Sequence, residues 1–373
     1  MANFELEGTG RARRFDHVLI TAVLLLTGVG FVTLYSASYS FAENFYGGNK
    51  WHFVSHQMIL AGFGFFMMFV ISHIKMETLR LMIKPAILGT IVLCCLTFVP
   101  KLGVTINGAS RWIRIGQWSF QPSEAVKIVL PLYLAHIFDK KQEKLDVFTE
   151  GILPPTLITA LFFTLIYLQN NFSTAFFVAA NALVLFFLVG LKMRYFLSAT
   201  VILLPISFLL ILTKEHRLRR VISFIWPEWE PLGAGYQVRA SVLTIVSGGF
   251  WGKGLGQGTR KIRSVPEIHS DFVFASYAEE SGFIGVILFM ALFGLFAYRG
   301  YCCALRQTDG FKKLLTAGLV TLIVSQALMN IAVVAGAVPA TGVPLPFFSA
   351  GGSSLAVTLI ACGFIINVSR EQV

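Results

Sequence analysis

Apolar runs separated by short polar segments recur along the whole chain. Ten of these runs hold at least about 17 residues, the length of helix that crosses a bilayer core. They cover residues 17–38, 52–72, 84–100, 122–138, 152–168, 172–191, 195–213, 272–298, 314–337 and 351–368. Unpaired backbone is costly in lipid and the alternation of a membrane barrel is missing, so each run is predicted to be a helix. The prediction is a single all-α, polytopic membrane domain over residues 1–373.

Basic residues divide the predicted loops into two kinds. If the N-terminal tail (1–15) lies inside, sixteen Lys and Arg fall in inside segments and four in the short outside loops. Positive charge collects on the cytoplasmic side of membrane proteins. This bias and the even number of runs place both chain ends in the cytoplasm. Residues 214–271 then form one large extracytoplasmic loop between the seventh and eighth helices.

The composition agrees with a membrane protein. Hydrophobic residues make up 55% of the chain and charged residues 13%, whereas a soluble domain is about 25% charged. The net charge of +11 is usual where Lys and Arg face anionic headgroups, so nucleic acid is not an expected partner. The five cysteines have neither zinc-type spacing nor a disulfide framework.

The large outer loop is itself basic. It carries nine Lys and Arg, among them Arg239, Lys253 and Lys261, against five acidic residues. So much positive charge beside a membrane indicates an anionic partner, and phosphate on a lipid is the natural candidate. Glycines at 247–258 either let backbone N–H groups approach a ligand or permit tight turns. No Walker sequence follows them.

Glu267, His269 and Asp271 precede the eighth run. Asp271 falls at or just before the first helical turn. It is predicted either to cap the helix or to act as a base at the membrane face, beside the basic loop. Glu279 and Glu280 follow inside the run, where acids need partners. These two are expected to share a proton or to meet a cation from across the bundle.

The second outside loop alternates in character over residues 111–115. Arg111 is therefore expected at the membrane interface, and ordinary anchoring is the simplest explanation for it. Gln121 and Ser123 follow at the start of the fourth run.

Glu124 and Lys127 are three residues apart, so they share a helix face and can pair. The pair is either structural or part of a site for a substrate phosphate. The cost of placing a lysine inside a span favours the phosphate site. The last loop contains prolines, paired glycines and serines such as Ser353. This composition predicts irregular backbone that enters the membrane and forms a wall of the cavity that holds the substrate phosphate.

In this order, the motifs resemble those of the SEDS family of bacterial cell-wall glycosyltransferases, and the resemblance covers nearly the whole chain. The matching stretches are LYSAS (34–38), NGASRWIRIG with FQPSEAVK (107–127), HRLRRVISFIWPEWEPLGAGYQVRAS (216–241), SGGFWGKGLGQG (247–258), VPEIHSDFVFA with EESGFIG (265–285) and GVPLPFFSAGGSS (342–354). The residues of these motifs are more similar to those of the FtsW branch, which acts in division, than to those of the RodA branch, which acts in elongation.

The resemblance implies that the chain polymerises lipid II into glycan strands at the outer face of the bacterial cell membrane, at the division septum. The family's required acid matches Asp271, and its basic and acidic positions after the third span match Arg111, Glu124 and Lys127. A class B penicillin-binding protein, which is a transpeptidase, and other division proteins are the implied partners. Two departures are Asn171, where the family often has an acid, and Ala350, where tyrosine is usual.

The mechanism expected from these residues is one inverting displacement. Asp271 takes the proton of an acceptor hydroxyl, and undecaprenyl pyrophosphate leaves the donor sugar. Arg111, Lys127 and the loop cations stabilise the leaving group, with Gln121, Ser123, Glu267, His269 and Ser353 as further substrate contacts. A divalent cation, Mg²⁺ or Mn²⁺, is an alternative source of positive charge, with ligands unassigned. A lipid II flippase and a purely structural division protein are the rival functions.

Overall fold

The computed structural model describes residues 15–106, 108–116, 118–226, 234–258 and 270–370. Every predicted run contains one described helix. These helices are α1 (His17–Phe45), α2 (His52–His73), α4 (Ile83–Leu96), α5 (Pro122–Lys140), α6 (Leu153–Leu168), α7 (Phe172–Leu188), α8 (Met193–Leu212), α12 (Val273–Leu305), α13 (Gly310–Val334) and α14 (Gly352–Ser369). A short α3 (Met76–Leu81) lies between α2 and α4, and a 3-10 turn (Gln142–Lys144) and a π-helical turn (Phe148–Ile152) lie between α5 and α6.

Six described segments are long and apolar enough to cross a membrane: His17–Phe45, His52–His73, Phe148–Leu168, Val273–Leu305, Gly310–Val334 and Gly352–Ser369. Helices α4 and α7 are apolar but shorter. The chain is therefore a mostly helical polytopic membrane protein. Ten crossings and the cytoplasmic placement of both ends stay predictions.

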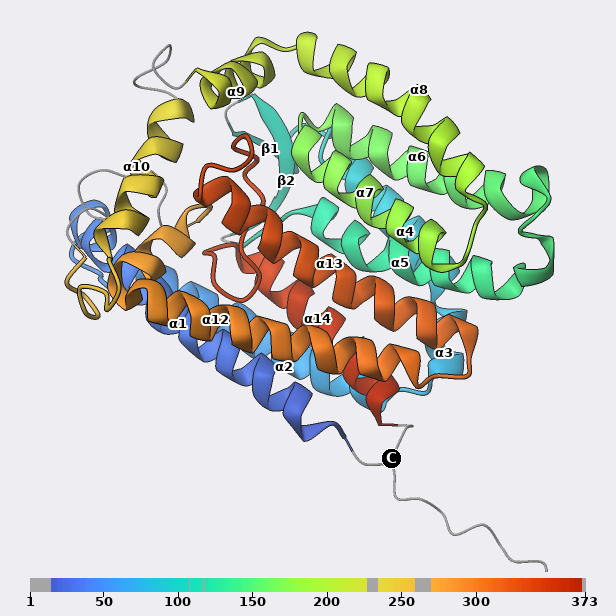
Figure 1. Ribbon diagram of the computed structural model, residues 1–373, viewed down its shortest axis with the longest axis horizontal. Coiled ribbons are helices and arrows are strands. Elements are labelled where there is room, and N and C mark those ends of the chain that lie inside the picture. Colours follow the sequence, from blue (N-terminus) through green and yellow to red (C-terminus); the bar gives the residue numbers. More distant parts are fainter. Residues whose placement is uncertain (1–14, 107, 117, 227–233, 259–269, 371–373) are drawn as a thin grey trace, which may run out of the picture.

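The bundle is organised around α13, which packs against α12, α5, α7 and α14. Helix α14 lies along α2 and is almost wholly buried, while α1 packs on α12 (Figure 1). Close approach between α1 and the segment before α14 depends on Gly30, because a Cβ there would lie 2.2 Å from the Phe347 carbonyl oxygen. The segment 335–351 therefore enters the bundle and packs within it.

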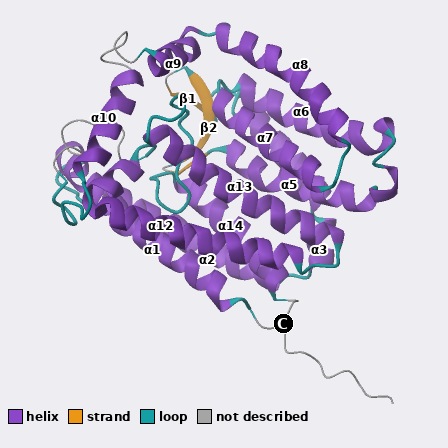
Figure 2. Ribbon diagram, in the orientation of Figure 1, coloured by secondary structure: helices purple, strands orange, loops and turns teal. Residues whose placement is uncertain are grey.

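The all-α prediction is wrong for residues 103–120. They form a three-stranded antiparallel sheet of β1 (Gly103–Ile106), β2 (Ala109–Ile115) and β3 (Trp118–Phe120), in the order β1-β2-β3 (Figure 2). The alternation at 111–115 is the period of a strand, and Ile113 is buried while Arg114 is exposed. A hairpin partner on each side of β2 satisfies its backbone groups.

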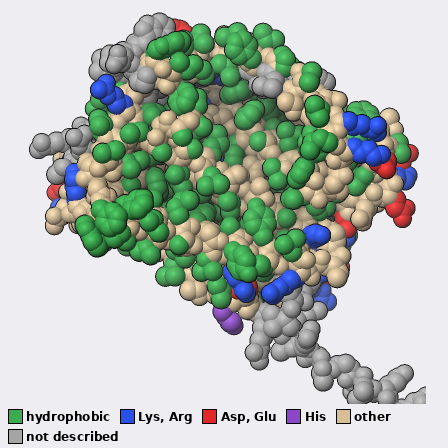
Figure 3. Space-filling model, in the orientation of Figure 1, with side chains coloured by type: hydrophobic (Ala, Val, Ile, Leu, Met, Phe, Trp, Pro, Cys, Tyr) green, Lys and Arg blue, Asp and Glu red, His purple; other side chains and the backbone are tan. Residues whose placement is uncertain are grey.

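The described parts of 214–271, which was predicted to be one large loop, contain two helices. They are α9 (Glu215–Ile225) and α10 (Ala234–Ser247), and α10 packs on α12. These helices lie with the sheet at the end of the bundle that is away from the C-terminus (Figure 1). Apolar side chains are spread over the face in Figure 3, and Lys and Arg lie mainly around its edges. This distribution suits a belt of lipid around the helices.

Candidate active site

Asp271 lies in the turn that leads into α12 and is partly exposed. The N-cap residue of α12 is Phe272, so Asp271 lies one residue before the position predicted for a capping side chain. The Asp271 backbone carbonyl accepts a hydrogen bond of 2.9 Å from the Asn330 amide. Its carboxylate lies against the 335–351 segment, since a Cβ on Gly342 would be 3.3 Å from Asp271 Oδ2.

Two arginines, Arg111 and Arg220, interact electrostatically with this carboxylate, and Arg217 of α9 lines the same cavity as both of them. Arg220 donates to the Ala340 carbonyl at 3.2 Å, and Arg111, from β2, donates to the Asn170 carbonyl. Burial lowers the pKa of Arg111 to about 10; the charges of Arg220 and Arg217 act in the same direction, and that of Asp271 opposes them. Asp271 is thus the counter-charge to a cluster of cations.

A cavity of about 330 Å³ opens between β2, α7, α9 and the 335–351 segment. Arg111, His216, Arg217 and Arg220 supply its positive charge. Arg217 is buried, and its guanidinium lies 4.8 Å from the Tyr167 ring centroid and 5.0 Å from that of Phe172. The stacking holds this cation in place beside the cavity.

Several buried polar atoms of the cavity lining have no hydrogen-bond partner within the described residues. They are Arg111 Nε, Arg217 Nε, Asn171 Nδ2 and Thr341 Oγ1. Buried polar groups are normally paired, and a cluster of unpaired ones indicates groups that a ligand or water completes. Three of the four atoms are hydrogen-bond donors and the fourth is a hydroxyl, so the cavity suits an oxyanion such as phosphate.

Glu124 and Lys127 form the predicted ion pair, with Lys127 Nζ 2.7 Å from Glu124 Oε1. Lys127 also donates to Gln326 Oε1 at 3.1 Å. Both charged side chains are buried inside α5 and neither lines the arginine cavity. Gln121 and Ser123 are hydrogen-bonded to each other at 2.9 Å at the start of α5.

The glycine-rich segment folds back onto α12. Lys253 Nζ lies 2.7 Å from Glu279 Oε1, while Glu280 Oε1 accepts from Gly256 N at 3.0 Å and from Ser36 Oγ at 2.5 Å. The two intramembrane acids therefore find partners, and the cation comes from the loop. The backbone of α12 is kinked here at Gly282, with φ 66° and ψ −167°. In this arrangement the glycines serve the close packing of loop and helix.

The remaining predicted contacts are dispersed. Arg239 is exposed on α10 and Ser353 is buried at the start of α14. Lys261, Glu267 and His269 lie outside the described residues. Neither Arg239 nor Ser353 lines the arginine cavity.

Arg217, Arg220, His216 and Asn330 are candidate site residues that sequence reasoning did not single out. Arg217, Arg220 and His216 belong to the sequence HRLRR (216–220), a run of positive charge within little more than one helical turn. Helix α9 is strongly amphipathic, and that periodicity could have placed Arg217 and Arg220 on one face, three residues apart. For Asn330, an amide inside an apolar run was the available signal.

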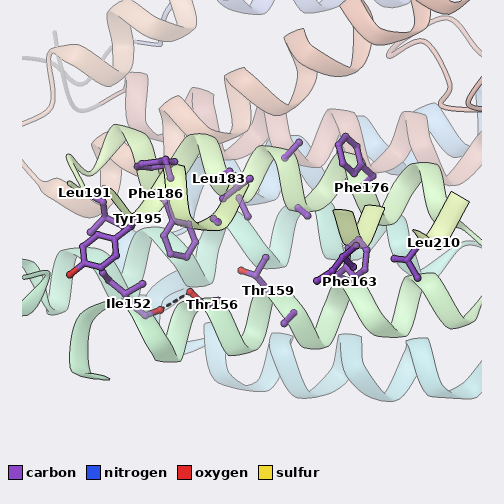
Figure 4. A pocket seen from close by; sticks show the side chains of 17 residues that line it. Ile152, Thr156, Thr159, Phe163, Phe176, Leu183, Phe186, Leu191, Tyr195 and Leu210 are labelled. Carbon is purple, nitrogen blue, oxygen red and sulfur yellow. Dashed lines mark hydrogen bonds between the residues drawn. The ribbon is translucent and has the colours of Figure 1, made fainter. Parts of the chain in front are cut away.

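An apolar groove of about 280 Å³ lies between α6, α7 and α8 (Figure 4). Its lining is aliphatic and aromatic, with hydroxyls from Thr156, Thr159 and Tyr195. Phe176 lines both this groove and the arginine cavity. A ligand could therefore place a charged group among the arginines and an apolar chain between the helices.

A divalent cation is not favoured by the described donors. No group of three or more His, Cys, Asp and Glu suited to a metal occurs in the described ranges. The charged groups described around Asp271 are arginines, whereas Mg²⁺ and Mn²⁺ prefer carboxylate and carbonyl oxygens.

The sequence is similar to those of known proteins over nearly its whole length. Residues 16–373 match the model of the FtsW, RodA and SpoVE family, described as cell cycle proteins. The chain is 38% identical over 363 residues to "Probable peptidoglycan glycosyltransferase FtsW" of Geobacter sp. strain M18, covering 97% of this chain and 98% of the relative. It is 34% identical over 360 residues to stage V sporulation protein E of Bacillus subtilis strain 168, covering 95% and 97% of the two chains.

Two solved structures share the fold over nearly the whole chain. One is a chain of a peptidoglycan synthase complex that coordinates polymerization and crosslinking, with a TM-score of 0.80, 28% identity and coverage of 96% and 98%. The other is the rod shape determining protein RodA of Thermus thermophilus, with a TM-score of 0.69, 27% identity and coverage of 96% and 97%.

Proposed function

Because the chain belongs to the FtsW, RodA and SpoVE family of cell cycle proteins, we propose that it is a peptidoglycan glycosyltransferase. Its substrate is lipid II, which it joins into glycan strands during septal wall synthesis. The names of its relatives at 36–38% identity over nearly the full length support this activity. FtsW is the name that several of these relatives carry, so division is favoured over the elongation role of RodA.

The observation that carries the proposal is the position of Asp271 beside the arginine cavity. A lipid-linked pyrophosphate needs cations for its charge and an apolar surface for its chain. Arg111, Arg217 and Arg220 line the arginine cavity and supply the cations. The groove between α6, α7 and α8 supplies the apolar surface. Phe176 is shared by the two, so one lipid can occupy both.

In the proposed reaction, Asp271 takes the proton from the 4-hydroxyl of the acceptor sugar. The oxygen of that hydroxyl forms a bond to the anomeric carbon of the donor, while the bond from this carbon to the pyrophosphate oxygen breaks. The pyrophosphate leaves as an anion, and arginines stabilise the charge that develops on it. One displacement inverts the α-linked donor to a β-linked product, without a covalent enzyme intermediate.

The apolar groove bears on the rival transporter function. A flippase must carry the pyrophosphate head across the bilayer, which calls for a polar route. The groove offers few polar groups along its length, among them Thr156 and Thr159. It suits a hydrocarbon chain, and a charged head within it would be left without partners.

A transpeptidase of the penicillin-binding class is the proposed partner. The structural relative from a complex that couples polymerization with crosslinking supports such a pairing. Location at the septum, in a multi-pass membrane setting, is part of the same proposal.

The test uses purified protein with labelled lipid II, with and without the transpeptidase, and compares wild type with Asp271→Asn. The variant should fold and insert normally but form no glycan polymer. Glu43→Gln is the matched control, since Glu43 is an exposed acid paired with Lys50, and it should polymerise like wild type. Normal polymer formation by Asp271→Asn would refute the role of Asp271 as base.

A further inference from the structure

We propose that Asn330 is a positioning residue for Asp271. It holds the backbone of the candidate base in a fixed position relative to the segment against which the Asp271 carboxylate lies. The inference rests on the proposed function, in which Asp271 is the base. Asn330 is on α13, 1% exposed, and lies where α13 meets both the turn before α12 and the 335–351 segment.

A single amide group makes both connections. Asn330 Nδ2 donates to the Asp271 carbonyl at 2.9 Å and to the Val343 carbonyl at 2.8 Å. Both of its protons are therefore used. Val343 follows Gly342, against which the Asp271 carboxylate lies. Asn330 thus fixes the backbone that carries the carboxylate and the backbone on which the carboxylate rests.

The same face of α13 extends this connection by one turn. Gln326 is four residues earlier; its Nε2 donates to the Pro344 carbonyl at 2.9 Å and its Oε1 accepts from Lys127. Residues four apart lie on one helix face. The segment at 343–344 is therefore held at two adjacent carbonyls. Lys127 reaches the candidate site through Gln326, although it lies outside the arginine cavity.

The positions of the two carbonyls that accept from Asn330, those of Asp271 and Val343, indicate a role beyond stability. A buried amide in a membrane bundle must be paired, and a carbonyl within its own helix would suffice, as for Asn181, which donates to Phe177 O at 2.9 Å. Asn330 instead reaches out of its helix to two irregular segments that meet at the candidate base. A base that is misplaced by about 1 Å loses up to about 100-fold in rate.

Asn367 provides a matched control within the chain. It is buried on α14, and its Nδ2 donates to Ile71 O at 2.6 Å and to Ile74 O at 2.7 Å. It therefore makes the same pair of bonds to two backbone carbonyls of a neighbouring segment, at the end of α2 and away from Asp271. Its loss should weaken the fold without displacing the base.

The experiment compares Asn330→Asp, Asn330→Ser and Asn367→Asp with wild type, in lipid II polymerisation and lipid II binding. Asp keeps the shape but loses the donor, and Ser restores one donor. We expect kcat to fall about 10–100-fold in Asn330→Asp, with lipid II affinity within about twofold of wild type and partial recovery in Asn330→Ser. Asn367→Asp should keep its kcat while lowering thermal stability.

Two results would overturn the inference. One is a wild-type kcat in folded Asn330→Asp, and the other is an equal loss of kcat in Asn367→Asp, which would mean that general destabilisation is the cause. If Asp271→Asn retains polymerisation, the proposed function fails separately from this inference. Both substitutions at Asn330 preserve a small side chain, so at least one folded variant is expected.

Discussion

Replacing Lys127 by methionine removes one half of an ion pair inside the bundle. The charged side chains of Lys127 and Glu124 are 3% and 4% exposed, with 2.7 Å between Nζ and Oε1. The Glu124 carboxylate would remain buried without its cation. Breaking a buried pair in this way costs about 3–5 kcal/mol of the free energy of unfolding. The double variant Glu124→Gln/Lys127→Met removes both charges and should recover most of that loss.

The free energy of unfolding can be measured by titrating the protein with SDS in mixed micelles and following tryptophan fluorescence. Lys50→Met is the matched control, because Lys50 and Glu43 form a pair in which each side chain is 46% exposed. That exposed pair should contribute about 0–1 kcal/mol. An SDS midpoint for Lys127→Met equal to wild type would refute the burial reasoning. A double variant that is stable but cannot polymerise lipid II would show that the Glu124–Lys127 pair also serves the substrate.

Three further outcomes follow from other parts of the structure. Gly282→Ala should destabilise the protein by about 3 kcal/mol or more in the same unfolding assay, because φ is 66° and the new Cβ would lie 2.2 Å from Gly252 N, whereas Gly294→Ala meets nothing within 4 Å and should be tolerated. Burial, followed by neighbouring arginine charges, lowers the pKa of His216 below its usual 6.5. Undecaprenyl phosphate should therefore bind more tightly as pH falls through that pKa and His216 gains a proton, and titration calorimetry of His216→Gln should show a flatter dependence. Ala180→Trp should fill the apolar groove and raise KM for long-chain lipid II several-fold more than for a short-chain analogue; equal effects on both would contradict a chain-binding groove.

Much of the helical architecture was readable from local pattern. Long apolar runs predict helices because lipid leaves the backbone no other partner, and a described helix occupies each run. The spacing of Glu124 and Lys127 predicts their contact because three residues span nearly one helical turn. Asp271 stood out by its motif and by its place between a basic segment and an apolar run.

The sheet at 103–120 and the arginine cavity depended on contacts between distant segments. Strand pairing at Val104 and Trp112 is set by a turn and by register, and no helical periodicity reveals it. The cavity joins Arg111, Arg217 and Thr341, which come from a strand, a helix and a broken loop. Their charges have meaning for a phosphate only once packing brings them to one place.

Lys253 and Asn330 are opposite examples of what sequence and tertiary structure each reveal. Composition marked Lys253 as a loop cation for the substrate's pyrophosphate, but the fold pairs it with Glu279. Asn330 had no motif to recommend it, yet tertiary packing puts its amide between Asp271 and Val343. The sequence by itself determined the long apolar helices, the charged segments and the acid that is the candidate base. Only the tertiary structure decided which charges on distant segments pair, because such pairing depends on distances between parts that are far apart in the chain.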